Sequence, residues 1–197
     1  MGLEVKTLKI GIDLDDTINN LVEVWIDRYN KDYSDNLKIE DIETWDIGDY
    51  SKIGKNFYNY LGDGETFKNL SVKDGAANII EKLCEQHEVY IVTANASYNK
   101  GVCDDKVNFI KKFMPFFSIK NIIFINDKSL LNLDILIDDG LHNFEGFKGF
   151  KKVVFNRPWN TTNPQPPFYR MYRWDNIIID KINIWSKQID SIQANVD

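Results

Sequence analysis

The chain has 197 residues, of which 43% are hydrophobic and 27% are charged, and its formal net charge at pH 7 is −6. This composition is ordinary for a soluble globular protein, and the length allows one domain with a sizeable core and a smaller insert. The acidic balance argues against a nucleic-acid polymer as partner, because a phosphate backbone requires a basic binding face. A small phosphorylated ligand is allowed, since a bound metal ion supplies local positive charge.

No secretory signal is visible at the N-terminus, and no apolar run approaches the length of a membrane span. The two cysteines, Cys84 and Cys103, lie in or beside predicted helices. We expect them to be buried or neutral thiols of a reducing compartment. The sequence therefore predicts a cytoplasmic protein that contacts no membrane.

Five short apolar segments are predicted to form buried parallel strands. Each is rich in Ile or Val and lacks polar alternation, as expected when both faces of a sheet are covered. In chain order they are Leu8–Leu14, Glu88–Thr93, Asn121–Ile125, Leu133–Ile137 and Lys152–Phe155. Apolar residues at helical spacing fall between several of them, at positions 76, 79, 80 and 83 and at positions 107, 110, 113 and 114. We therefore predict an α/β fold with a Rossmann-like, doubly wound parallel sheet.

The interval between the first and second strands is far longer than one crossover helix requires. It begins with an amphipathic helical pattern from Ile18 to Tyr29 and continues with aromatic residues dispersed among Gly and Asp. We predict that residues 18–70 form a small helical cap above the catalytic edge of the sheet. Residues 1–17 and 71–197 would then form the catalytic core.

The segment after the last predicted strand contains several prolines between Asn156 and Pro167, which forbid regular structure. A closing helix is predicted beyond it, with its cap near Trp174 or Asp175 and apolar residues at positions 178, 182, 185 and 189 on one face.

The segment from Lys9 to Thr17 changes from an apolar run to three carboxylates and a hydroxyl, directly before a helical pattern. In an extended segment alternate side chains share a face, so Asp13 and Asp15 are predicted to point the same way. Neighbouring carboxylates are costly unless a cation or a proton separates their charges. The cluster therefore predicts a Mg²⁺ site with a carboxylate left over for chemistry. Asp16 is assigned no role beyond shaping the turn.

Polar groups follow four of the predicted strands at the carboxyl edge, where open α/β sheets bind ligands. They are Asp13 with Asp15, Thr93, Lys128, and Asp138 with Asp139. Their convergence on one edge is much harder to reach by chance than any single group, each of which alone has an ordinary structural explanation as a turn, cap or surface residue.

The residue types predict a division of labour in phosphoryl transfer. Asp13 and one member of the pair Asp138/Asp139 can hold Mg²⁺, which prefers oxygen ligands. Thr93 and Lys128 offer a hydroxyl donor and a fixed cation to phosphoryl oxygens. Asp13 is then the predicted nucleophile, which forms an aspartyl-phosphate. In a separate role, Asp15 protonates the leaving oxygen and later activates the water that releases phosphate.

Response-regulator receiver domains, which are signalling modules, also combine acidic residues, a Thr or Ser and a Lys on an α/β sheet. Their phosphorylated Asp lies on the middle strand, before the hydroxyl and the lysine. In this chain the second acidic pair comes last, and a long insert follows the first strand. The order of the motifs therefore favours an enzyme over a signalling module.

The four motifs resemble those of the haloacid dehalogenase superfamily of phosphohydrolases. Asp13–Thr17 resembles its first motif, Thr93 the second, Lys128 the third and Asp138-Asp139 the fourth. Asp-Lys-Ser ahead of Ile-Asp-Asp, together with a cap after the first motif, resembles more narrowly the 5'(3')-deoxyribonucleotidase branch, the cytosolic type C group with its bacterial and phage relatives. The resemblance covers nearly the whole chain to about Asn156.

The resemblance implies Mg²⁺-dependent release of phosphate from nucleoside 5'-monophosphates, typically pyrimidine deoxyribonucleotides. It also implies that Asp13 is both nucleophile and metal ligand, and that Asp15 is the acid/base and offers its backbone carbonyl to the metal. Both Asp138 and Asp139 belong to the implied metal site, and which of them touches Mg²⁺ directly stays open.

Substrate preference is less determined. A basic residue can follow the acidic pair in this branch, whereas Gly140 stands here, and Ala94 stands where a serine can follow the threonine. Among the cap aromatics, Trp45 is our first choice for stacking on a base, followed by Tyr50 and Phe57, although core packing is the more ordinary role of such residues.

Two other functions stay open at this point. One is a capped phosphatase of the same superfamily that acts on a sugar or another small organic phosphate. The other is a phospho-binding or signalling module without turnover. The expected partner is a small phosphomonoester, with no nucleic-acid polymer and no membrane, and a homodimer is compatible with the sequence.

Overall fold

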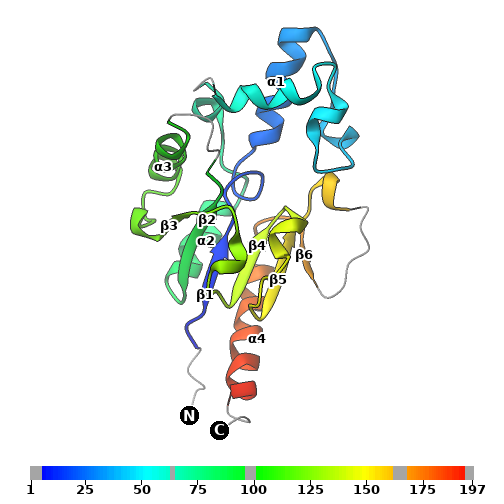
Figure 1. Cartoon of the computed structure of the whole chain (residues 1–197). Coiled ribbons are helices and arrows are strands. Elements are labelled where there is room, and N and C mark those ends of the chain that lie inside the picture. The colour runs from blue at the N-terminus through cyan, green and yellow to red at the C-terminus, as the bar shows by residue number, and fades with distance from the viewer. Residues whose placement is uncertain (1–5, 63–64, 96–100, 162–167, 194–197) are drawn as a thin grey trace.

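The computed structural model describes residues 6–62, 65–95, 101–161 and 168–193. Its centre is one fully parallel sheet with the strand order β3-β2-β1-β4-β5-β6 (Figure 1). The strands are β1 (Lys9–Ile12), β2 (Glu88–Thr93), β3 (Ile122–Phe124), β4 (Ile135–Asp138), β5 (Lys151–Phe155) and β6 (Tyr169–Met171). The predicted Rossmann-like α/β fold is confirmed, with strand bounds within three residues of those expected.

Strand β6 was not predicted from the sequence. It is three residues long, it includes Arg170, and it pairs with Val153–Phe155 of β5 at the edge of the sheet. A strand this short, with a charged residue at its centre, shows no apolar run. Its existence depends on the neighbouring strand rather than on its own pattern.

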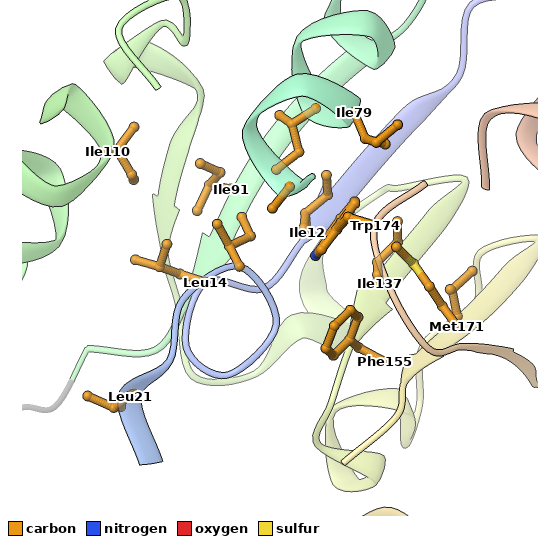
Figure 2. Close-up of a cluster of buried hydrophobic side chains, with 14 of the residues drawn as sticks. Ile12, Leu14, Leu21, Ile79, Ile91, Ile110, Ile137, Phe155, Met171 and Trp174 are labelled. Atoms are coloured by element: carbon orange, nitrogen blue, oxygen red, sulfur yellow. The ribbon is translucent and has the colours of Figure 1, made fainter. Parts of the chain in front are cut away.

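One face of the sheet is covered by three helices, α2 (Ala76–Cys84), α3 (Val102–Phe113) and α4 (Asn176–Gln193). Their apolar sides pack on the strand residues in one large core, part of which is drawn in Figure 2. The predicted closing helix is therefore confirmed, with Ile178 and Ile182 buried. Cys84 ends α2 and is exposed, whereas Cys103 lies in α3 and is half-buried, and both are free thiols.

The other face of the sheet is covered by short segments. Val92, Leu136 and Val154 on this face pack against a smaller apolar cluster that includes Phe144 and Phe147. Right-handed crossovers place the β3–β4 and β4–β5 connections here, and neither contains an α-helix. They form the single turns η6 (Lys128–Leu130) and η7 (Leu141–Phe144).

The segment between β1 and β2 forms α1 (Leu21–Tyr33) and four 3₁₀ helices, and it projects beyond the carboxyl edge of the sheet (Figure 1). The 3₁₀ helices are η1 (Ile39–Asp41), η2 (Ile47–Tyr50), η3 (Gly54–Gly62) and η4 (Phe67–Asn69). The predicted amphipathic helix is confirmed, because its apolar side from Leu21 to Tyr29 is buried. An antiparallel bridge between Asn19 and Val72 joins the two ends of the segment.

The proline-containing segment after β5 forms one short 3₁₀ helix, η8 (Pro158–Asn160), and residues 162–167 of the predicted loop lie outside the described residues. Within the described parts of the chain, every helix is too short or too polar to cross a lipid bilayer.

Candidate active site

The candidate site lies where the strand order reverses, at the carboxyl ends of the adjacent strands β1 and β4 (Figure 1). Connections leave β1 and β4 toward opposite sides at this point, which opens a crevice in sheets of this kind. Strand β1 ends at Ile12, and the Asp13 N–H continues the pairing by donating to Ile137 O at 2.9 Å. The four strand-end groups predicted from the sequence therefore start from neighbouring positions.

The geometry after β1 differs from the expected alternation along an extended strand. The chain turns directly after Leu14, whose carbonyl accepts from the N–H groups of Ile18 and Asn19. Asp13 and Asp15 still line one cavity. They lie together because of this turn, and not because alternate residues of a strand share a face.

Asp16 occupies the turn in a left-handed conformation, with φ of 56°. Its N–H donates to Asn19 Oδ1, and its carboxylate accepts from the Val22 N–H at the start of α1 and from Arg157. Burial and the nearby Glu23 raise the pKa of Asp16 well above its usual value, against the effect of Arg157. The side chain thus fixes the turn and the start of α1.

Lys128 lies between two carboxylates from neighbouring strands. Its Nζ donates to Asp13 Oδ1 and to Asp138 Oδ2, both at 2.5 Å, and the residue is 3% exposed. The turn before it is fixed because Asp127 accepts from the N–H and the hydroxyl of Ser129. Burial alone lowers the pKa of Lys128, but the two carboxylates outweigh it and raise that pKa, so the side chain stays cationic.

The carboxylates around Lys128 outnumber it. Oxygens of Asp13, Asp138 and Asp139 lie within 4.8 Å of one another, and all three residues are buried. Burial raises the pKa of Asp13 well above its usual value, Lys128 opposes this shift, and the other acids add to it. Burial and the charge of Asp138 likewise raise the pKa of Asp139 to about 7. The single positive charge of Lys128 therefore does not balance the three carboxyl groups of this cluster.

The three acids fit a divalent metal ion. They supply only carboxylate oxygens, the ligand type that Mg²⁺ and other hard cations prefer. Asp138 Oδ1 already accepts from the Gly140 N–H and from Asn143 Nδ2, which fixes the orientation of that carboxylate. A bound cation would also offset the repulsion that raises the acid pKa values.

Lys106 is a functional candidate that sequence reasoning missed. Its Nζ lies 2.6 Å from Asp15 Oδ2, and it donates to Thr93 Oγ1 and Ala94 O, both at 2.8 Å. The residue is 3% exposed and lies on α3, one turn from the buried Val102 and Ile110. A lysine on the apolar side of a predicted helix was the signal that could have revealed it.

Thr93 ends β2 as predicted, but it contacts Lys106 and is fully buried rather than lining the cavity. Asp15 has a second contact, because Asn19 Nδ2 donates to its Oδ1 at 2.9 Å. The structure therefore connects Thr93 of the second motif to Asp15 through Lys106, and it connects Lys128 of the third motif to Asp13 directly.

A cavity of about 400 Å³ lies between the carboxyl edge of the sheet and the 18–70 segment. Asp13, Asp15, Lys106, Lys128 and Asp139 form its polar end. The remaining lining is largely apolar and aromatic: Leu21, Val22, Trp25, Trp45, Ile47, Tyr58, Leu61, Val102 and Trp159, with Asp16, Ala94, Asn95, Asn126, His142 and Asn143. The cavity therefore has a charged end, where a bound cation would be needed to hold an anion, and an apolar compartment for the rest of a ligand.

The cap aromatics chosen from the sequence separate in the structure. Trp45 lines the cavity, is 52% exposed and contacts His142 edge-on with ring centroids 4.5 Å apart. Phe57 is fully buried between Trp25 and Tyr29, so it is unavailable for stacking on a base, and Tyr50 is absent from the lining.

Gly140 has a steric role in this arrangement. A Cβ at this position would lie 2.8 Å from His142 Cε1, 2.9 Å from Asn143 Nδ2 and 3.1 Å from Trp45 Cη2. The side chains of the cavity wall thus occupy the space that a larger residue would need.

Comparison with solved structures defines the fold class. The HAD hydrolase YfnB of Bacillus subtilis, solved bound to magnesium, superposes with a TM-score of 0.55 at 15% identity, covering 88% of this chain and 98% of that chain. A haloacid dehalogenase-like protein of Agrobacterium tumefaciens gives a TM-score of 0.56 at 11% identity, covering 91% and 99%. The fold is therefore that of the haloacid dehalogenase-like hydrolases.

Sequence comparison identifies the family. Residues 6–188 match the model of the 5' nucleotidase, deoxy (pyrimidine), cytosolic type C proteins. The chain is 42% identical to the 5'(3')-deoxyribonucleotidase of Clostridium acetobutylicum over 84% of this chain and 89% of that protein. It is 33% identical to the protein of the same name from Bacillus subtilis, over 85% and 95%. The chain belongs to this family of nucleotidases, which are hydrolases of phosphoric monoesters.

Proposed function

We propose that the protein is a Mg²⁺-dependent phosphatase that hydrolyses nucleoside 5'-monophosphates, with pyrimidine deoxyribonucleotides preferred, through an aspartyl-phosphate. The observation that carries this proposal is the placement of Asp13. Its carboxylate lines the polar end of the cavity, is held by Lys128 and lies beside Asp138 and Asp139. The names of the relatives, 5'(3')-deoxyribonucleotidase, support the substrate class.

Asp13 acts as the nucleophile in this proposal. The oxygen that does not accept from Lys128 attacks phosphorus, a P–O bond to Asp13 forms, and the bond to the sugar oxygen breaks. Mg²⁺, held by Asp13, the backbone carbonyl of Asp15 and the pair Asp138/Asp139, would neutralise negative charge on the phosphoryl oxygens. Lys128, which is itself 3% exposed, adds a fixed cation beside the attacked phosphoryl group.

Asp15 moves the proton. It donates to the leaving sugar oxygen as nucleoside departs, then takes a proton from the water that hydrolyses the aspartyl-phosphate. Lys106 and Asn19 hold its two carboxylate oxygens, so its orientation is fixed before substrate binds. Thr93 is fully buried and does not line the cavity, so in this proposal its oxygen accepts from Lys106 and holds that lysine against Asp15.

In this proposal the apolar part of the cavity holds the nucleoside, and the polar end holds the phosphate. Apolar residues of the 18–70 segment, which we propose as a cap on the 1–17 and 71–197 core, line the compartment opposite the acids. Trp45 is available for stacking on a base.

An Asp13→Asn variant tests the nucleophile. It is expected to remain folded and to lose all Mg²⁺-dependent phosphate release, because an amide cannot form the acyl phosphate. Asp180→Asn, at an exposed acid of α4, is the matched control and should behave as the wild type. Retained activity in Asp13→Asn would contradict the mechanism.

A substrate panel tests the specificity separately. We expect turnover of dUMP and dTMP to exceed that of UMP, purine nucleotides and sugar phosphates. Equal turnover of the whole panel would contradict the nucleotidase proposal and favour a general small-phosphate phosphatase. Absence of phosphate release from every compound, with and without Mg²⁺, would favour a binding module.

A further inference from the structure

The turn of residues 157–160, which leaves the carboxyl end of β5, contacts Asp139 at two points. The indole Nε1 of Trp159 donates to Asp139 Oδ2 at 2.9 Å, and Asn160 Nδ2 donates to the main-chain oxygen of Asp139 at 2.8 Å. Trp159 and Asn160 are 7% and 1% exposed, so water competes little for these bonds. Both the backbone and the carboxylate of Asp139 are therefore held by this turn.

The turn is itself fixed to the sheet. Asn160 Nδ2 also donates to Phe155 O in β5, and Asn160 Oδ1 accepts from the Arg157 N–H. From β6, Arg170 donates to both the side-chain and the main-chain oxygen of Asn160, at 2.7 and 3.0 Å. With this many partners Asn160 has little freedom, and the position of Trp159 follows from it.

The same turn reaches the other side of the site through Arg157. Its Nη2 donates to Glu23 Oε1 of α1 at 2.7 Å and lies 3.3 Å from Asp16 Oδ1 in the turn after β1. The guanidinium carbon lies 4.8 Å from the centroid of the Trp159 ring. Residues 157–160 thus contact helix α1, the turn after Asp13, and Asp139.

We propose that the 157–160 turn positions Asp139 for metal binding, with Trp159 and Asn160 as positioning residues. A carboxylate oxygen has two lone pairs, so Asp139 Oδ2 can accept from the Trp159 indole and still ligate a cation. Holding the carboxylate in place removes the entropy cost of orienting it when the metal arrives. The inference rests on the proposed function, because it takes Asp139 as a ligand.

Trp159→Phe tests this role, since it removes the N–H donor and keeps an aromatic ring. Titration calorimetry of the full chain with Mg²⁺ is expected to show roughly 10–100-fold weaker binding, the usual effect of losing a hydrogen bond to a metal ligand. Trp185→Phe is the matched control, because Trp185 is also 7% exposed but lies on α4 away from the cavity. Its Mg²⁺ affinity should equal that of the wild type.

Kinetics provide the second measurement. Phosphate release by Trp159→Phe should require more Mg²⁺ by the same factor, while kcat at saturating Mg²⁺ is recovered. A fall in kcat that Mg²⁺ does not restore, or an unchanged Mg²⁺ affinity, would overturn the inference. Equal weakening in Trp185→Phe would overturn it too, because lost packing would then suffice.

Two further measurements distinguish failure of the positioning role from failure of the proposed function. If Trp159→Phe does not fold, Asn160→Ser makes the same test through the main chain of Asp139, and wild-type Mg²⁺ affinity in that variant would overturn the inference. A wild-type protein that neither binds Mg²⁺ nor releases phosphate would contradict the proposed function itself. An active wild type with unaltered Mg²⁺ binding in Trp159→Phe would contradict only the positioning role.

Discussion

Replacing Lys106 by Met is the sharpest test of how the acid/base is held. The change keeps the apolar stem and removes the charge that lies 2.6 Å from Asp15 Oδ2. It also removes the donor to Thr93 Oγ1 and Ala94 O. Among the described residues, Asp15 then keeps only the hydrogen bond from Asn19 Nδ2.

The contacts set the size of the effect. Breaking a fully buried ion pair costs about 3–5 kcal/mol, but the Asp15 side chain is 23% exposed and regains some hydration. We therefore expect a loss of about 1–3 kcal/mol in the free energy of unfolding. A positioned acid contributes roughly 10²–10⁴-fold to rate, and the Asn19 bond preserves part of the orientation, so kcat/KM for a nucleotide should fall about 10²-fold.

The assay compares two leaving groups. Because kcat/KM reports the steps up to departure of the alcohol, it depends on the acid for a nucleotide, whose leaving oxygen needs a proton, and far less for p-nitrophenyl phosphate. The kcat/KM of the Lys106→Met variant should therefore fall much further for the nucleotide than for p-nitrophenyl phosphate. Lys111→Met, on the exposed side of the same helix, is the control. An equal fall on both substrates, or no fall on the nucleotide, would refute the role given to Lys106.

Three other outcomes are expected. Gly75→Ala should lower unfolding stability in urea by about 1–3 kcal/mol, because Gly75 has φ of 79° and a Cβ would lie 2.3 Å from Trp174 O. Gly101→Ala should cost less, because Gly101 also has positive φ but a Cβ there would meet no atom of the described residues within 4 Å. Trp45→Ala should raise KM for dTMP by the loss of about 1–3 kcal/mol of stacking and leave KM for p-nitrophenyl phosphate nearly unchanged. The pKa of Asp139 is raised to about 7, so the folded metal-free protein keeps a proton on this carboxyl that the unfolded chain loses near pH 4. The melting temperature of the metal-free protein should therefore fall as the pH rises from 4 to 7. Addition of Mg²⁺ at pH 8 should restore the melting temperature. A flat melting profile, or no response to Mg²⁺, would contradict the last of these.

The sequence by itself determined the sheet and most of the polar end of the site. Buried parallel strands are continuous apolar runs, and this local property located β1 to β5. Parallel strands end at one edge, so Asp13, Lys128 and Asp138 could be placed together without knowing any contact between them. The structure brings these three to direct hydrogen-bonding distance.

Tertiary packing decided the rest. Lys106 pairs with Asp15, from a distant part of the chain, and its helical pattern alone does not show which charge it meets. Packing also buried Phe57 and left Trp45 exposed at the cavity, although both are aromatic residues of one segment. Trp159 lies in a proline-containing turn with no periodic pattern, and its bond to Asp139 exists only because β5 lies beside β4. Local pattern determines which residues are buried or extended, whereas the partner of a buried polar group depends on which elements pack against each other.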